Sequence, residues 1–219
     1  MKKMTHKAEA NRLVSARLII SNSLEPPSMA QLLAPFGYDT PRIKEGETLL
    51  NTAELLIARH NKEYGDQYAA TEALNKQYAE ARAFYMEHVK LARVAQKKHP
   101  SMDGSLQLQG QRKRTISGWL VQARIFYENA LGIVEIKEAL NAYGVDKDAL
   151  VSGMERVNAV DVALSAQKRK ISVAQTTTKE KDRVMDALDE WVSEFKSVAR
   201  VALKDDSQLL EAFGIVTPS

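Results

Sequence analysis

Cysteine is absent from all 219 residues of the chain. Disulfide frameworks, thiolate metal sites and cysteine nucleophiles are therefore excluded. The absence also favours the cytosol, where disulfides are rare. No apolar run approaches the 18 or so residues that a membrane-spanning helix needs, so we expect no membrane span.

The residues and motifs of known catalytic centres are equally scarce. The chain has four histidines, and none has a glutamate three positions before it. The Glu-x-x-His pairs of di-metal helix bundles are therefore missing. No G-x-S-x-G motif, P-loop or G-x-G-x-x-G motif is present either. The sequence therefore predicts a protein without a metal, a cofactor or enzymatic activity.

Charge of one sign is not in large excess. The 31 basic side chains outnumber the 28 acidic ones by only three, whereas dedicated nucleic-acid-binding proteins carry a dense positive field. Arg112, Lys113 and Arg114 form the basic cluster that would contact phosphates in a nucleic-acid-binding protein. Charge runs near helix ends are more often solvated faces, which is the interpretation that we favour.

What the chain does have is a match to itself. An offset of 107 positions aligns residues 8–97 with 115–204 without a gap, with 18 identities in 90 pairs. The sequence LARVAQK at 91–97, for example, returns as VARVALK at 198–204. A match of this length at a fixed offset predicts a tandem duplication, with one repeat at 1–104 and the other at 105–219.

Apolar residues within each repeat follow helical spacing, and no stretch resembles a strand. The sequence therefore predicts an all-α fold in which each repeat is a bundle of three long helices. Short connector helices end at Gly37 and Gly144, which tolerate the left-handed conformation past a helix end. Because Gly65 and Asp66 form a short turn, the helices on either side should pair as an antiparallel hairpin. The long helices are expected at 6–24, 41–64 and 66–98, and then at 115–131, 147–173 and 177–204.

Two kinds of shared residue stand out on these predicted helices. Gly46 and Gly153 lie inside helices, where glycine costs about 1 kcal/mol relative to alanine. We therefore expect another helix to approach closely at both places. Arg17 and Arg124 occupy positions that should face inward, and a buried guanidinium needs polar partners. The expected partners, also shared by the repeats, are Glu87, Glu194, Asn51 and Asn158.

The inward arginines allow two interpretations. A structural clasp that sets the register of the helices is the simpler one. A small-ligand site, held in each repeat by the same polar groups, is the alternative.

The C-terminal segment 209–218, LLEAFGIVTP, resembles LLAPFGYDTP at 32–41. In the first repeat that sequence leads into a helix, whereas here the sequence ends, which suggests an unfinished further copy. Its apolar residues are more than a free tail leaves in water, so we expect the tail to dock on a neighbouring copy or to fold back on its own bundle. The candidate self-association residues are Leu209, Leu210, Phe213, Ile215 and Val216.

Together these features predict a non-enzymatic structural or assembly protein. We expect a homo-oligomer in which copies associate head to tail, without a membrane anchor. A basic nucleic-acid-associated protein is the first alternative, and a small-ligand binder is the second.

Overall fold

The computed structural model describes residues 6–216, and all the regular secondary structure in this range is helical. The all-α prediction is thereby confirmed. The elements are α1 (His6–Leu24), α2 (Pro27–Leu33), the 3-10 helix η1 (Ala34–Phe36), α3 (Thr40–Gln96), α4 (Met102–Leu106), α5 (Ile116–Gly132), α6 (Val134–Asn141), α7 (Lys147–Ala202) and α8 (Ser207–Ala212).

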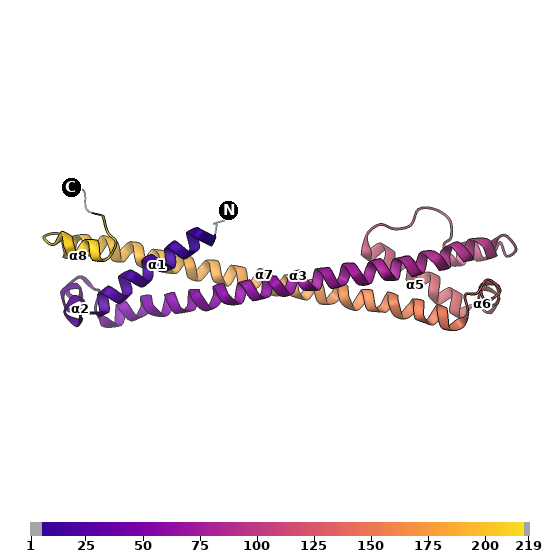
Figure 1. The fold of residues 1–219 in the computed structure, drawn as a ribbon, viewed down its shortest axis with the longest axis horizontal. Helices are drawn as coiled ribbons and strands as arrows, with labels where there is room; N and C mark the ends of the chain where they lie inside the picture. Colours follow the sequence, from indigo (N-terminus) through magenta and orange to yellow (C-terminus); the bar gives the residue numbers. More distant parts are fainter. Residues whose placement is uncertain (1–5, 217–219) are drawn as a thin grey trace. The chain divides into compact units, whose positions relative to one another are not determined.

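The chain forms two compact units, and each takes residues from both predicted repeats (Figure 1). Unit 1 comprises Met1–Tyr64 and Val173–Ser219, of which the described part holds α1, α2, η1, α8 and one half each of α3 and α7. Unit 2 comprises Gly65–Ser172 and holds α4, α5, α6 and the other halves of α3 and α7. The units therefore do not follow the division into 1–104 and 105–219.

The prediction of three long helices in each repeat is wrong, because α3 and α7 are unbroken. They run for 57 and 56 residues, straight through the turns expected at Gly65 and before Thr177. No proline lies between Pro41 and Pro100 or between Pro100 and Pro218, so no residue in either helix interior lacks its backbone N–H. One internal glycine costs only about 1 kcal/mol, which tertiary packing readily overrides. Each repeat thus has one helix of ordinary length and one very long helix.

The starts of the two long helices are alike. The Asp39 carboxylate accepts a hydrogen bond from the Arg42 backbone N–H at 3.0 Å, and Asp146 accepts one from Ala149 at 2.8 Å. Asp39 is therefore the side chain that satisfies a free N–H at the start of α3. These two aspartates are 107 positions apart, as are the first residues of α3 and α7.

The connectors end as expected. Gly37 and Gly144 have φ angles of +87° and +82°, in the left-handed region that glycine tolerates. Each follows a short helical segment, η1 in unit 1 and α6 in unit 2.

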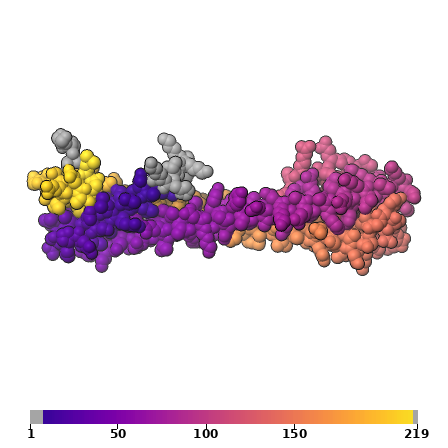
Figure 2. All heavy atoms as spheres, viewed as in Figure 1, coloured from indigo at the N-terminus to yellow at the C-terminus, as the bar shows by residue number. Residues whose placement is uncertain are grey.

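Unit 1 has its own hydrophobic core, which joins α1, α2, α8 and the unit 1 halves of α3 and α7. The halves of α3 and α7 are antiparallel, since Arg42 pairs with Glu194 and Arg59 with Glu180. In the space-filling view α8 lies against the N-terminal helices (Figure 2). The fully buried members of this core include Ala16, Ile19, Leu33, Ile43, Ala53, Leu188, Phe195, Ala199 and Phe213.

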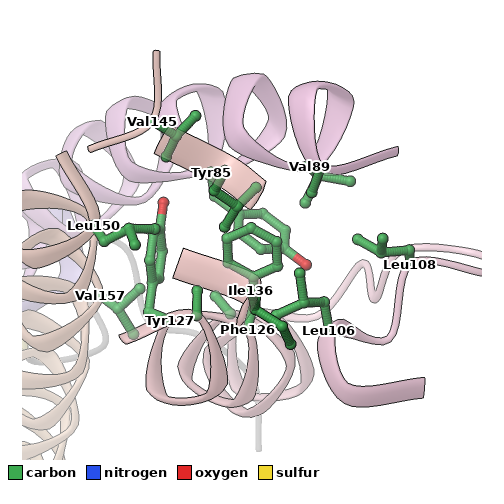
Figure 3. Close-up of a cluster of buried hydrophobic side chains, with 14 of the residues drawn as sticks. Tyr85, Val89, Leu106, Leu108, Phe126, Tyr127, Ile136, Val145, Leu150 and Val157 are labelled. Atoms are coloured by element: carbon green, nitrogen blue, oxygen red, sulfur yellow. The ribbon is translucent and has the colours of Figure 1, made fainter. Parts of the chain in front are cut away.

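Unit 2 has a second core, and it is rich in aromatic rings (Figure 3). The Tyr85 ring makes edge contacts with Trp119, Phe126 and Tyr127, with centroids 5.4–6.2 Å apart. Such arrangements are favourable for aromatic quadrupoles. Around the rings lie aliphatic side chains that include Val89, Leu106, Leu108, Ala123, Leu140, Val145, Leu150 and Val160.

Gly46 and Gly153 do lie at close approaches, and in both cases a ring takes the space. A Cβ atom on Gly46 would lie 2.5 Å from the Trp191 ring, and one on Gly153 would lie 2.2 Å from the Tyr127 ring. Trp191 comes from α7, whereas Tyr127 comes from α5. Both glycines therefore make room for an aromatic ring, which comes from the long helix α7 in unit 1 and from the shorter helix α5 in unit 2.

Gly65 offers a direct test of the unbroken helix. It lies in the interior of α3, and a Cβ atom there would meet nothing within 4 Å. Gly65→Ala should therefore raise the free energy of unfolding by about 1 kcal/mol, measured by urea denaturation, because alanine favours helix. A turn at this position would reverse the sign.

Gly46→Ala is the matched control. The same substitution in the same helix should lower stability by about 1–3 kcal/mol, because the added methyl group overlaps the Trp191 ring.

Candidate functional site

The two arginines expected to face inward do not. The side chain of Arg17 is 62% exposed and that of Arg124 is 41% exposed. Arg17 pairs with Glu54, and Arg124 pairs with Asp161 at 3.0 Å. The two acidic partners are themselves 107 positions apart, so the same ion pair joins the shorter helix to the long helix in both units. The guanidinium groups lie at the surface, which removes the basis of a ligand site built around buried arginines.

The expected partners were wrong as well. Glu87, Asn51 and Asn158 are exposed, and Glu194 pairs with Arg42 at 3.1 Å. The error was one of helix phase. The buried stripe of α1 is Ala16, Ile19, Ile20 and Ser23, whose small members resemble neutral surface residues in a sequence. Arg17 follows Ala16 directly and is therefore turned about 100° from this stripe, which places the arginine outside the core.

The C-terminal segment folds back on its own unit. Leu210, Phe213 and Ile215 are buried in the core of unit 1, and Leu209 packs against that core. Val216 alone of the candidate set is exposed, and the last part of the sequence echo, at 217 and 218, lies outside the described residues. The apolar tail is thus part of the fold and not a free docking segment.

A different comparison explains this segment better than the echo of 32–41. Asn22 donates a hydrogen bond to the Ala212 carbonyl, and Asn129 donates one to the Ser105 carbonyl, both at 2.6 Å. Donors and acceptors are each 107 positions apart. Residues 209–215 therefore correspond to 102–108, at the end of the first repeat, and they complete the second repeat instead of starting a third.

The basic cluster is partly used within the fold. Arg112 donates to the Tyr85 hydroxyl at 3.1 Å and to the Gln109 carbonyl at 2.8 Å. The Lys113 backbone N–H donates to the buried Gln122 side chain at 3.1 Å. Arg112 therefore holds the connection before α5, and the exposed side chains that remain for phosphate are Lys113 and Arg114.

A histidine and a tyrosine meet inside unit 2. The Tyr127 hydroxyl lies 3.2 Å from Nδ1 of His88, and both residues are buried. Burial lowers the pKa of His88 and raises the pKa of Tyr127, so both are neutral at physiological pH. The residue that corresponds to His88 in the second repeat is Phe195, also buried. The position therefore requires a ring, and the hydrogen bond is an addition of unit 2.

Ionic and polar contacts hold α1 to α7 in unit 1. Lys181 pairs with Glu9, and the two side chains are only 9% and 13% exposed. Arg12 donates from Nε to Asp189 at 2.8 Å and from Nη2 to the Met185 carbonyl at 2.9 Å. We call these contacts the polar ladder; its last rung is the Lys196 ammonium, which donates to the Ser15 hydroxyl at 3.2 Å.

The corresponding interface of unit 2 has no such ladder. Ile116 stands where unit 1 has Glu9, and Leu74 stands where it has Lys181; both pack in the core of unit 2. Trp119 takes the place of Arg12 and lies fully buried, with its ring 5.1 Å from that of Tyr78. Corresponding positions of the two interfaces therefore carry charged side chains in unit 1 and apolar side chains in unit 2.

A surface feature occurs in both units. Exposed valine or leucine side chains flank the Arg17–Glu54 and Arg124–Asp161 ion pairs, and between 62% and 72% of each is accessible to solvent. One lies a helical turn before the arginine, and the other directly follows the acidic residue. We call this feature the recurring patch: it comprises Val14, Arg17, Glu54 and Leu55 in unit 1, and Val121, Arg124, Asp161 and Val162 in unit 2.

Residues 6–216 hold no cluster of three or more histidine or acidic side chains that could bind a metal ion. None of the helices described in this range is long and apolar enough to cross a membrane. No family model, no curated protein and no solved structure matches the chain. The recurring patch is therefore the candidate functional site, chosen on the geometry of this chain alone.

The polar ladder predicts a large difference between single and double substitutions. Lys181→Leu alone should lower the free energy of unfolding by about 3–5 kcal/mol, because it replaces the ammonium group beside the buried Glu9 carboxylate with an apolar side chain. Glu9→Ile with Lys181→Leu installs the apolar pair of unit 2, and should be neutral or stabilising. Urea denaturation of both variants measures the difference, and equal losses would show that the pair does not act as a unit.

His88 predicts a pH dependence. Because its folded pKa is lowered below the value of about 6.5 in the unfolded chain, the unfolded state binds the extra proton. This contribution to stability is complete above that value and is lost as the pH falls below it, by at most about 1.4 kcal/mol per pH unit. His88→Phe should remove this part of the slope between pH 7.5 and about 5. Identical slopes for the wild type and the variant would contradict the assignment.

Proposed function

We propose that this chain is a duplicated, non-enzymatic helical protein that works by self-association, and that the recurring patch is where copies meet. The observation that carries the proposal is the presence of the same exposed apolar residues around the same ion pair in both units. The tail of the chain has no part in it, because Leu210, Phe213 and Ile215 are buried in the core of unit 1.

The recurrence is informative because the repeats have diverged. Only 18 of 90 aligned pairs are identical, yet position 14 and its counterpart 121 are both valine, and both are exposed. Leu55 and Val162 are likewise apolar and exposed. Single exposed apolar residues are common and need no explanation. Here two exposed apolar residues flank the same ion pair in two diverged repeats. This recurrence supports a role in contact with another protein surface.

The charges of the patch favour a second copy of the chain as the partner. Each patch carries one cation and one anion, so it presents no net charge to a nucleic acid or to an acidic or basic peptide. Two such patches complement each other, since the arginine of each can face the carboxylate of the other. The apolar side chains on either side would then be buried together.

Each chain has two patches, and we expect the unit 1 patch of one copy to meet the unit 2 patch of another. A unit 1 patch that meets the unit 2 patch of another copy makes a head-to-tail contact, because the two surfaces belong to different parts of the chain. Such contacts close into rings or continue as filaments.

Leu55→Lys together with Val162→Lys tests the proposal. Each new ammonium group would have to lose its water at the contact, so the association should weaken by about tenfold or more. Light scattering over a concentration series measures it. The wild type should exceed the 24.4 kDa of one chain, and the double variant should approach it.

Leu32→Lys together with Val134→Lys is the matched control. These residues are also exposed and apolar and bring the same change in charge, but their counterparts in the other repeat are Ala139 and Pro27. The control should keep the mass of the wild type. A wild type that stays at 24.4 kDa up to about 1 mM would end the proposal.

A further inference from the structure

Because the two repeats are similar in sequence, the buried face of α1 has two segments against which it could pack. In the structure it lies against α7, through residues 181 to 196. The segment at 74–89, 107 positions earlier, could take the same place if α3 folded back after Tyr64. That would produce the self-contained bundle which the sequence predicts for the first repeat. The observed form, in which each unit borrows from both repeats, is here called the exchanged arrangement.

Many contacts do not distinguish the two arrangements. Arg42 pairs with Glu194 in unit 1, and the corresponding residue of α3 is Glu87, also a glutamate. The ion pair between Arg17 and Glu54 lies within the first repeat, so it would be the same in both forms. What selects the observed form must lie where residues 66–97 and 173–204 differ.

They differ at all three side chains of α7 in the polar ladder, Lys181, Asp189 and Lys196. Lys181, the partner of Glu9, is replaced by Leu74, so the self-contained form would bury the Glu9 carboxylate against a leucine. Asp189, the partner of Arg12, is replaced by Arg82, which would bring two guanidinium groups together. Lys196 is replaced by Val89, which has no donor for Ser15.

The second repeat has the opposite mismatch. In unit 2, Ile116 packs in the same core as Leu74, and the Trp119 ring packs against Tyr78. A self-contained second repeat would place Ile116 against Lys181, so the buried ammonium group would exchange the Glu9 carboxylate for an apolar side chain. Both repeats are therefore penalised in the self-contained form, and neither is in the exchanged form.

We propose that the polar ladder is a selection device, which makes the chain adopt the exchanged arrangement instead of two self-contained bundles. Gly65 leaves the alternative sterically open, because it stands in α3 where the fold-back would occur and has open space around it. The inference does not depend on self-association, since every contact in it lies within one chain.

Two spin labels on α3 distinguish the arrangements, and the absence of native cysteine makes them simple to place. Asn51→Cys and Gln77→Cys are exposed positions on this helix, 26 residues apart. In the unbroken helix their backbones lie about 39 Å apart, at 1.5 Å per residue. In a folded-back hairpin they would lie about 10 Å apart. Pulsed electron–electron resonance on labelled chain diluted with unlabelled chain measures the distance within one chain.

Lys181→Leu with Asp189→Arg gives α7 the residues that α3 has at 74 and 82, so the ladder no longer distinguishes the two segments. A short-distance population of about a tenth of the chains or more should then appear beside the long-distance one. Glu9→Ile with Lys181→Leu equalises one rung while keeping the interface packed, and should give a smaller short-distance population. This milder variant decides the matter if the first does not fold.

The control is Lys179→Leu with Glu190→Arg, the same changes in charge at exposed positions of α7. It should show the long distance alone, as should the wild-type background. A short distance in the wild type would overturn the proposal. So would its absence from both ladder variants while their helical circular dichroism is retained.

Discussion

The continuity of α3 and α7 is the constraint on which the rest of the structure depends. Each helix begins after an aspartate that accepts a backbone hydrogen bond, and beyond Pro41 in the first turn of α3 neither contains a proline. A single glycine is too weak to end such a helix when both of its halves have packed faces. Each helix therefore contributes one half to each unit, and neither repeat closes on itself.

The two units use one geometry with different chemistry. Unit 2 fills the space between α5 and α3 with Trp119 and other rings, which contribute stability through buried area. Unit 1 holds α1 with buried and half-buried ion pairs between side chains. These pairs contribute less to stability, but each charged group accepts only a partner of opposite charge. A duplicated chain needs such specificity in at least one unit, because a helix could otherwise pack against the corresponding segment of either repeat.

Most polar side chains of the two units serve the fold, whereas a smaller set lies at the surface. Arg112, His88 and the residues of the ladder have polar groups that are bound within their own unit. The recurring patch is different, because its valines and leucines are exposed and contribute little to the fold. For this reason the proposal of self-association is based on the patch and not on the more numerous buried polar groups.

Helical spacing, the glycines at 37 and 144 and the offset of 107 were sufficient to predict an all-α chain and its connectors. These properties depend on neighbours within one or two turns, and a sequence records them directly. The phase of α1 was missed because Ala16 and Ser23 are small, and side-chain size carries little signal. The recurring patch was missed because exposure is decided by neighbouring helices.

Which helices are neighbours was decided by the tertiary structure alone. Local signals at Gly65 are equally consistent with a turn and with a tolerated helical glycine. The choice depends on contacts such as Glu9 with Lys181, between residues 172 positions apart. Two repeats related by one offset present the same pattern in both possible pairings. Only the combined free energy of packing and ion pairing over the whole chain distinguishes them.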